Sequence, residues 1–264
     1  MRNLDSINPE FLRPSKLAVI SFFIMLALSI LSVPLAGGAA PNIPVIENRI
    51  VLFIFFVLGI SLILNIASLA FRWGWKAKNY GFSFLSFGCV SYLGLVPCAA
   101  TVLYSSAPYW VRAVVVIVYG VSNFLWCRKF IVLYEQAFNN ENLRSSIYEE
   151  DSDVVYYMRR GDEFILRKYF KFSQMPRNRY FLACIAVSLL MVPLMTPLQN
   201  FVGMPFVHIF LLIAMLPVSW MSIGFAVRGF LIFYKYPAKI KRTTGKDVYV
   251  DLVTKPRCYP VRRH

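Results

Sequence analysis

The residues most able to do acid–base chemistry gather in one polar segment between two apolar runs. Its carboxylates are Glu149, Glu150, Asp151, Asp153 and Asp162. Positioned carboxylates act as general acids and bases, so this cluster is the catalytic candidate of the chain. No Walker loop, nucleophile elbow or dinucleotide fingerprint accompanies it. We favour the simpler interpretation, in which these carboxylates neutralise nearby arginines or are solvated.

Basic residues follow the acidic cluster along the same segment. They are Arg159, Arg160, Arg167, Lys168 and Lys171. We expect them to attract anionic lipid headgroups or an acidic partner. On a helix, Ile165, Tyr169 and Phe172 share one face, which predicts that residues 163–172 form an interfacial helix on the membrane. A hairpin turn at residues 161–162 is the alternative.

Uncharged polar residues recur inside the apolar runs. The first group is Ser61, Asn65 and Ser68, and the second is Ser122 and Asn123 with Tyr119 and Trp126. Ser219 and Ser222 lie in the last run. Such groups line a pore or pack one helix against another, and small or amide side chains favour close packing in membranes. We therefore expect helix packing.

Cysteine and histidine give no pattern for a metal or a cofactor. The cysteines are Cys89, Cys98, Cys127, Cys184 and Cys258, without a C-x-x-C pair, and the histidines are His208 and His264. A zinc site needs closely spaced ligands of these types, so we expect no metal and no cofactor. Cys127 has the placement of a palmitoylation site and His208 that of a pH-sensitive gate, but ordinary packing explains both.

The elements that carry these residues are membrane helices. The chain is 58% hydrophobic and 16% charged, too apolar for a soluble domain. A membrane helix needs about 20 apolar residues, and six runs qualify: residues 17–35, 50–71, 81–104, 109–127, 180–200 and 205–227. The sequence predicts an all-α integral membrane protein, a six-span helix bundle. The basic start and the small residues 36–40 leave a cleaved signal peptide as an alternative for the first run.

The orientation follows from the positive charges. The chain has 28 Lys and Arg against 13 Asp and Glu, and only Arg49 and Arg112 fall on the side opposite to the rest. Cytoplasmic loops carry the excess of Lys and Arg, so both termini are predicted to be cytoplasmic. The charge indicates anionic lipid headgroups as a partner and argues against nucleic acid. The absence of an N-glycosylation sequon suggests a bacterial inner membrane.

Five regions follow from these patterns. They are a head at 1–16, spans at 17–127, a connection at 128–179, spans at 180–227 and a basic tail at 228–264. The tail has β-branched stretches around Gly245, which predicts a β-hairpin over residues 239–253. A lone hairpin is marginal in water. We therefore expect the tail and the connection to form one small mixed α/β cytoplasmic subdomain.

The interiors of the apolar runs lack ionisable residues. Arg112, Arg128 and Arg228 lie near span ends, where snorkelling is normal. Coupled transporters usually carry charges within the membrane, so this class is disfavoured. Three classes remain: a non-enzymatic protein that binds another protein, an uncoupled channel or small-solute transporter, and an enzyme acting on lipid. We favour the first, such as a membrane component of a secretion or transfer apparatus, or an immunity or exclusion factor.

Overall fold

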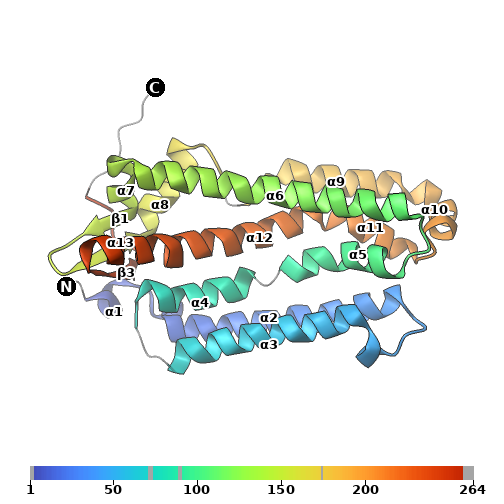
Figure 1. Cartoon of the computed structure of the whole chain (residues 1–264), viewed down its shortest axis with the longest axis horizontal. Coiled ribbons are helices and arrows are strands. Elements are labelled where there is room, and N and C mark those ends of the chain that lie inside the picture. The colour runs from blue at the N-terminus through green and yellow to red at the C-terminus, as the bar shows by residue number, and fades with distance from the viewer. Residues whose placement is uncertain (1–2, 71–73, 89–90, 174, 258–264) are drawn as a thin grey trace.

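The apolar runs fold into long helices that lie side by side, with a small sheet at one end (Figure 1). In lipid every backbone group needs an internal partner, which a helix provides. The computed structural model describes residues 3–70, 74–88, 91–173 and 175–257. The α-helices are α1 (Leu4–Ile7), α2 (Pro14–Ala39), α3 (Arg49–Ala70), α4 (Ala77–Gly88), α5 (Ser91–Tyr104), α6 (Tyr109–Asn139), α7 (Glu141–Ile147), α8 (Arg159–Phe164), α9 (Asn178–Leu190), α10 (Met195–Val202), α11 (Phe206–Ala214), α12 (Leu216–Phe230) and α13 (Tyr236–Thr244). Short 3-10 turns are η1 (Glu10–Leu12), η2 (Val45–Glu47) and η4 (Val192–Leu194), and π-helical turns are η3 (Ile165–Tyr169) and η5 (Leu231–Lys235).

The all-helical class is confirmed, but the six predicted spans are not. Among the described residues, five helical stretches are long and apolar enough to cross a membrane: Pro14–Ala39, Arg49–Ala70, Tyr109–Asn139, Asn178–Val202 and Leu216–Thr244. The third apolar run is shared between the shorter helices α4 and α5. The sixth run is divided at Met215 between α11 and α12, because Pro217 occupies the first turn of α12.

Many large apolar side chains lie on the surface of the bundle and many small polar side chains lie in its interior, the reverse of the usual distribution in a soluble protein. Large apolar side chains such as Phe23, Phe56 and Leu190 are exposed on the outside of the helices, whereas Ser21 and Asn65 are buried. Lipid tails solvate the exposed groups, so polar contacts hold the helices together. This distribution matches a bundle whose surface faces hydrocarbon.

Glycine lets α4 and α5 approach α12 closely. A Cβ atom added at Gly88 would lie 2.5 Å from the Cβ atom of Ala226, and one at Gly94 would lie 2.5 Å from the backbone nitrogen of Ser219. Both distances are too short for a real side chain. Small residues at such crossings are the usual means of close helix packing in membranes. The glycines therefore explain why both α4 and α5 lie so close to α12.

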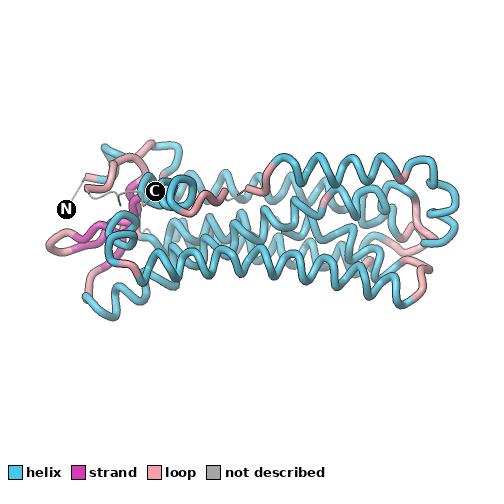
Figure 2. The backbone as a smooth tube through the Cα atoms, turned by 90° about the horizontal axis from the view of Figure 1, so that it is seen from above, coloured by secondary structure: helices cyan, strands magenta, loops and turns pink. Residues whose placement is uncertain are grey.

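The strands form a three-stranded sheet at one end of the bundle, in the order β1-β2-β3 (Figure 2). Strand β1 (Tyr148–Glu150) pairs antiparallel with β2 (Val154–Met158), and β2 pairs parallel with β3 (Asp247–Asp251). Every residue of β2 is buried. The sheet therefore joins the connection and the tail in one unit, as predicted, and we call α7, β1, β2, α8, η3, α13 and β3 together the polar subdomain.

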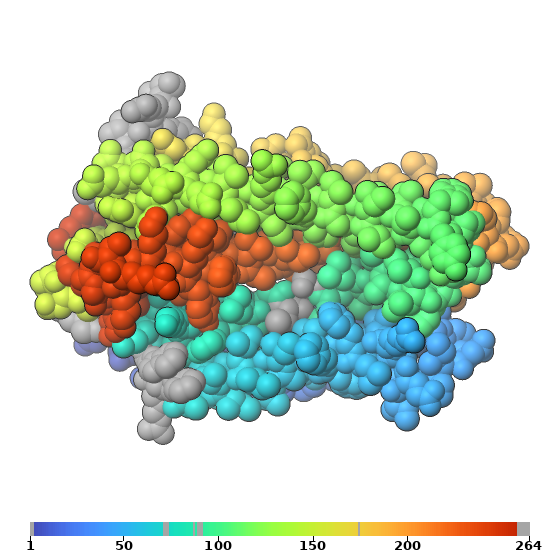
Figure 3. All heavy atoms as spheres, viewed as in Figure 1, coloured from blue at the N-terminus to red at the C-terminus, as the bar shows by residue number. Residues whose placement is uncertain are grey.

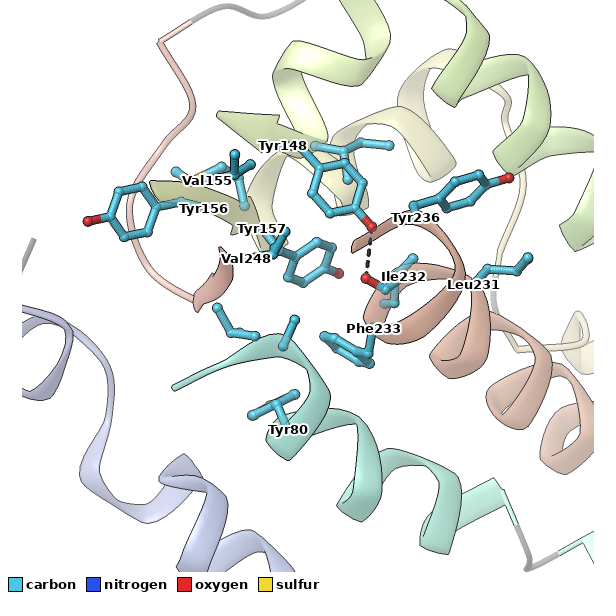
Figure 4. Packing of buried hydrophobic residues seen from close by; sticks show 14 of the residues in the cluster. Tyr80, Tyr148, Val155, Tyr156, Tyr157, Leu231, Ile232, Phe233, Tyr236 and Val248 are labelled. Carbon is cyan, nitrogen blue, oxygen red and sulfur yellow. Dashed lines mark hydrogen bonds between the residues drawn. The ribbon is translucent and has the colours of Figure 1, made fainter. Parts of the chain in front are cut away.

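Aromatic residues fill the core between the sheet and the helix ends. The ring of Tyr157 on β2 lies 5.3 Å from that of Phe233 (Figure 4). The Phe138 ring stacks on that of Tyr236 at 4.3 Å. The N-terminal head also joins this core, because Asn8 donates to the Val250 carbonyl at 3.0 Å and accepts from the Leu252 amide at 2.8 Å. The head, predicted as a separate polar region, is thus tied to β3.

The predicted hairpin over residues 239–253 is wrong in its first half. Residues Tyr236–Thr244 continue the long helix as α13, and only Asp247–Asp251 form a strand. Gly245 ends the helix in the left-handed region, with φ +73, as a C-terminal glycine commonly does. Strand β3 then finds a parallel partner in β2 instead of a hairpin partner.

Residues 163–172 do not form an interfacial helix on the membrane surface. They continue α8 into η3, and Ile165 is 1% exposed. Phe172 lies 5.4 Å from Trp126 and 5.1 Å from Phe130, both on α6. The aromatic face that the sequence assigned to lipid therefore packs on the protein. The hairpin turn at residues 161–162 is also absent, since both residues lie within α8.

Candidate functional site

Arg228 on α12 and Asp162 on α8 form a buried ion pair where the bundle meets the polar subdomain. Arg228 Nη2 donates to Asp162 Oδ2 at 2.5 Å, and the two side chains are 8% and 0% exposed. Tyr157 donates to the same oxygen at 2.5 Å, and Tyr134 donates to Oδ1 at 2.7 Å. Arg228 Nε in turn donates to the Tyr134 hydroxyl at 2.8 Å. The network is charge-balanced and links α6, β2, α8 and α12.

The tyrosines of the subdomain stay protonated. Burial raises the pKa of Tyr157 well above its usual value, and the negative charge of Asp162 adds to the shift. Burial raises the pKa of Tyr148 likewise, and its hydroxyl donates to the Ile232 carbonyl at 2.8 Å (Figure 4). Both side chains are therefore permanent donors, a structural role in which no proton is exchanged.

The sequence analysis missed this network. The sequence grouped Arg228 with arginines whose charged ends reach the membrane surface. In the structure its guanidinium is buried: apolar residues of η5 follow Arg228 in the chain, and Asp162 neutralises its charge. One signal was available: a single arginine within an apolar stretch requires a partner. The partner could not be identified, because Asp162 lies in a distant segment whose fold was uncertain.

The acidic cluster has partners in the tail instead of the neighbouring arginines. Glu149 pairs with Arg257 at 2.9 Å, and Glu150 pairs with Lys246 at 2.7 Å. These contacts fix β1 to the residues around β3. The two glutamates thus stabilise the subdomain.

Four basic residues form an exposed surface on α8 and the segment after it. We call Arg160, Arg167, Lys168 and Lys171 the basic ridge. All four are exposed, and within the described ranges none of them is in an ion pair. Arg159, predicted with them, pairs with Glu163 at 3.0 Å. A cleft of about 120 Å³ is lined by Arg167 and Phe172 and reaches Arg228, so one residue of the ridge shares a cleft with the buried arginine.

The polar residues of the second span meet other helices. Asn65 accepts from Ser21 on α2 at 2.8 Å and donates to Ser86 on α4 at 3.0 Å. Ser61 lies 2.5 Å from the same Ser86 hydroxyl, and Ser68 donates to Asn79 at 2.8 Å. All of these groups are buried between helices.

The polar residues of α6 make the same kind of contact with α12. Asn123 donates to the Ser219 hydroxyl at 3.1 Å, and Trp220 donates to Ser122 at 3.0 Å. Tyr119 donates to the Leu212 carbonyl on α11. The hydrogen bonds run between helices in both groups.

The remaining candidates are isolated. Cys127 is half-buried on α6, and His208 is 2% exposed and packs near Gly38 of α2. Cys89, Cys258 and His264 lie outside the described residues. Among the residues that are described, no group of three histidine, cysteine or acidic side chains is placed to hold a metal ion.

The fold and these contacts define a helical protein with helices long and apolar enough to span a membrane and a polar subdomain fixed to one end. Comparisons with protein-family models, with curated proteins and with solved structures gave no match.

Proposed function

We propose that this chain is a membrane protein that acts by binding another protein through the basic ridge. The observation that carries the proposal is the rigid presentation of four unpaired cations. The ridge residues flank Ile165 and Leu166 in the sequence, whose side chains are 1% and 4% exposed. Asp162, on the same helix as Arg160, accepts hydrogen bonds from three side chains. A fixed positive surface fits an acidic surface of a partner, because complementary charge steers and orients docking.

A protein partner fits the ridge better than a lipid surface does. An interfacial helix inserts an apolar face between headgroups, and here that face packs against Trp126 and Phe130. The ridge therefore offers charge without an apolar anchor. The partner class includes a component of a secretion or transfer apparatus and a toxin that an immunity or exclusion factor neutralises.

The contacts of the other polar groups support the same proposal. Asn65 and Asn123, the amide groups of the two polar clusters, are bonded to neighbouring helices, which argues against a polar conduit. Glu149 and Glu150 are held by Arg257 and Lys246, which argues against a catalytic pair acting on lipid. The excess of positive charge on the subdomain side supports a cytoplasmic location, at a bacterial inner membrane.

Complementation of a deletion strain tests the proposal. The variant R160E/R167E/K168E removes the positive ridge, and R128E/R177E/K255E makes the same change in charge at other exposed cations. We expect the ridge variant to lose function at normal membrane abundance and the control to keep it. Full function of the ridge variant would contradict the proposal, as would equal loss in the control.

A further inference from the structure

A second basic feature of the subdomain is a cleft between the start of α4 and α13. Its volume is about 580 Å³. The residues that line it are Lys76, Ala77, Lys78, Pro237, Ala238, Lys241, Arg242, Asp247 and Val248. In Figure 3 the red surface of α13 meets the blue-green surface of α4 at this end of the molecule. Four cations thus share the cleft with one carboxylate, while alanine, proline and valine supply an apolar part.

Two of the four cations are held in place by the carboxylate. Asp247 accepts from Lys76 at 2.8 Å and from Lys241 at 2.6 Å, one bond on each oxygen. These hydrogen bonds lower the pKa of Asp247, and the bond to Asp247 raises the pKa of Lys76. Asp247 and Lys76 therefore stay charged near neutral pH, and the hydrogen bonds orient both ammonium groups before any ligand arrives.

The other two cations have no acidic partner. Within the described part of the chain, neither Lys78 nor Arg242 is in an ion pair, and both are exposed. The cleft on the opposite side of α13 differs in this respect, because its cations Arg144 and Lys239 lie over the Phe138 ring at 5.7 and 4.9 Å. Of the two clefts beside α13, the one next to α4 is thus the one that combines oriented and free positive groups.

We infer that this cleft binds the phosphate headgroup of an anionic phospholipid. Lys78 and Arg242 contact the phosphate, Lys76 and Lys241 add to the positive field, and Ala77, Pro237 and Ala238 accept the glycerol part. The position favours a lipid source, since α3 ends at Ala70 and α4 begins at Ala77. The cleft therefore lies close to where an apolar span leaves the membrane, at the depth of headgroups.

Native mass spectrometry of the full chain in neutral detergent tests this site, with phosphatidylglycerol and phosphatidylcholine as probes. We expect phosphatidylglycerol to bind and K78Q/R242Q to weaken this binding about 30-fold, since each cation near an anionic lipid contributes about 1 kcal/mol, which is about fivefold in affinity, and the two effects multiply. The conservative K78R/R242K should stay within about threefold of the unmodified chain. The matched control R128Q/R177Q removes two exposed cations elsewhere and should leave binding unchanged.

A second variant adds repulsion without removing a cation. Ala238→Glu places a carboxylate in the cleft and should abolish phosphatidylglycerol binding, whereas Ala238→Gln of similar size should not. Equal binding of phosphatidylcholine, or equal loss in R128Q/R177Q, would overturn the site. Displacement of the lipid by millimolar inorganic phosphate would assign the cleft to a soluble phosphate compound and overturn the lipid source.

Discussion

The helix bundle and the polar subdomain bury polar groups in two different ways. In the bundle, neutral side chains such as Asn65 and Ser86 bond between helices. At the base of the subdomain, Arg228 and Asp162 are ionised and buried together. Interhelical bonds of the neutral kind average about 0.6 kcal/mol, whereas loss of one partner of a buried ion pair costs about 3–5 kcal/mol. The bundle should therefore tolerate changes that the subdomain does not.

Breaking the ion pair should have the largest effect on stability. Asp162→Ala leaves Arg228 buried without a counter-charge and should lower the free energy of unfolding by about 3–5 kcal/mol. Denaturation of the purified protein in detergent measures the loss. The double variant D162L/R228M removes both charges and should recover at least half of it, because apolar replacement of a buried pair is often neutral. A double variant no better than D162A would contradict the charge explanation.

Disturbing the close helix packing in the bundle should cause the second-largest loss of stability. Gly94→Ala drives a methyl group into the Ser219 backbone and should cost about 1–3 kcal/mol, as overpacking does. Gly120→Ala on α6 is the matched control, since nothing lies within 4 Å of its added Cβ atom. Thermal unfolding of both variants gives the comparison. Similar melting temperatures for the two would mean that α5 and α12 are not held at this separation.

Removing a neutral hydrogen bond should have a smaller effect. Asn65→Ala and Asn123→Ala should each cost about 0.6 kcal/mol, with about 2 kcal/mol as the upper value. Both variants should complement a deletion strain at normal abundance. Loss of function in these variants with retained function in R160E/R167E/K168E would favour a polar path through the bundle, and hence a channel or transporter.

The partly exposed ion pairs of Asp247 should make the smallest contribution to the free energy of unfolding. Lys241 and Lys76 lower its pKa, so the pairs stabilise the fold above the unfolded pKa and this stability is lost as the pH falls through the folded value. Near neutral pH the free energy of unfolding of the unmodified chain should exceed that of the Asp247→Asn variant by under about 1 kcal/mol, because the paired groups are partly exposed. The difference should begin to fall near pH 3.9, the usual aspartate pKa, and vanish only below the lower pKa that Asp247 has in the folded protein. Urea titrations of both proteins at several pH values measure it.

The sequence predicts the bundle better than the subdomain. Apolar runs such as the one around Asn65 are local signals, and the polar residues in them were correctly placed within helices. The division of the sixth run at Met215 was missed, although Pro217 in the first turn of α12 was a local signal for it.

The subdomain depends on contacts between distant segments. Strand β3 pairs with β2 across nearly a hundred residues of chain, and Asp162 meets Arg228 across 66 residues. No local periodicity encodes such pairing. The segment at 239–244 has a helical neighbour in the sequence and continues it, which β-propensity alone could not reveal. The candidate ridge residues were identified by charge, but their anchoring required the structure.

The most direct measurement of the central claim is photo-cross-linking in native membranes. A photoreactive residue replaces Lys168 on the ridge in one variant and Val118, exposed on α6, in the other. The account predicts that the Lys168 probe forms a discrete cross-link to another protein, and that R160E/R167E abolishes it, while the Val118 probe reaches only lipid. Cross-links from Lys168 to lipid alone, or a protein cross-link that persists in R160E/R167E, would contradict it.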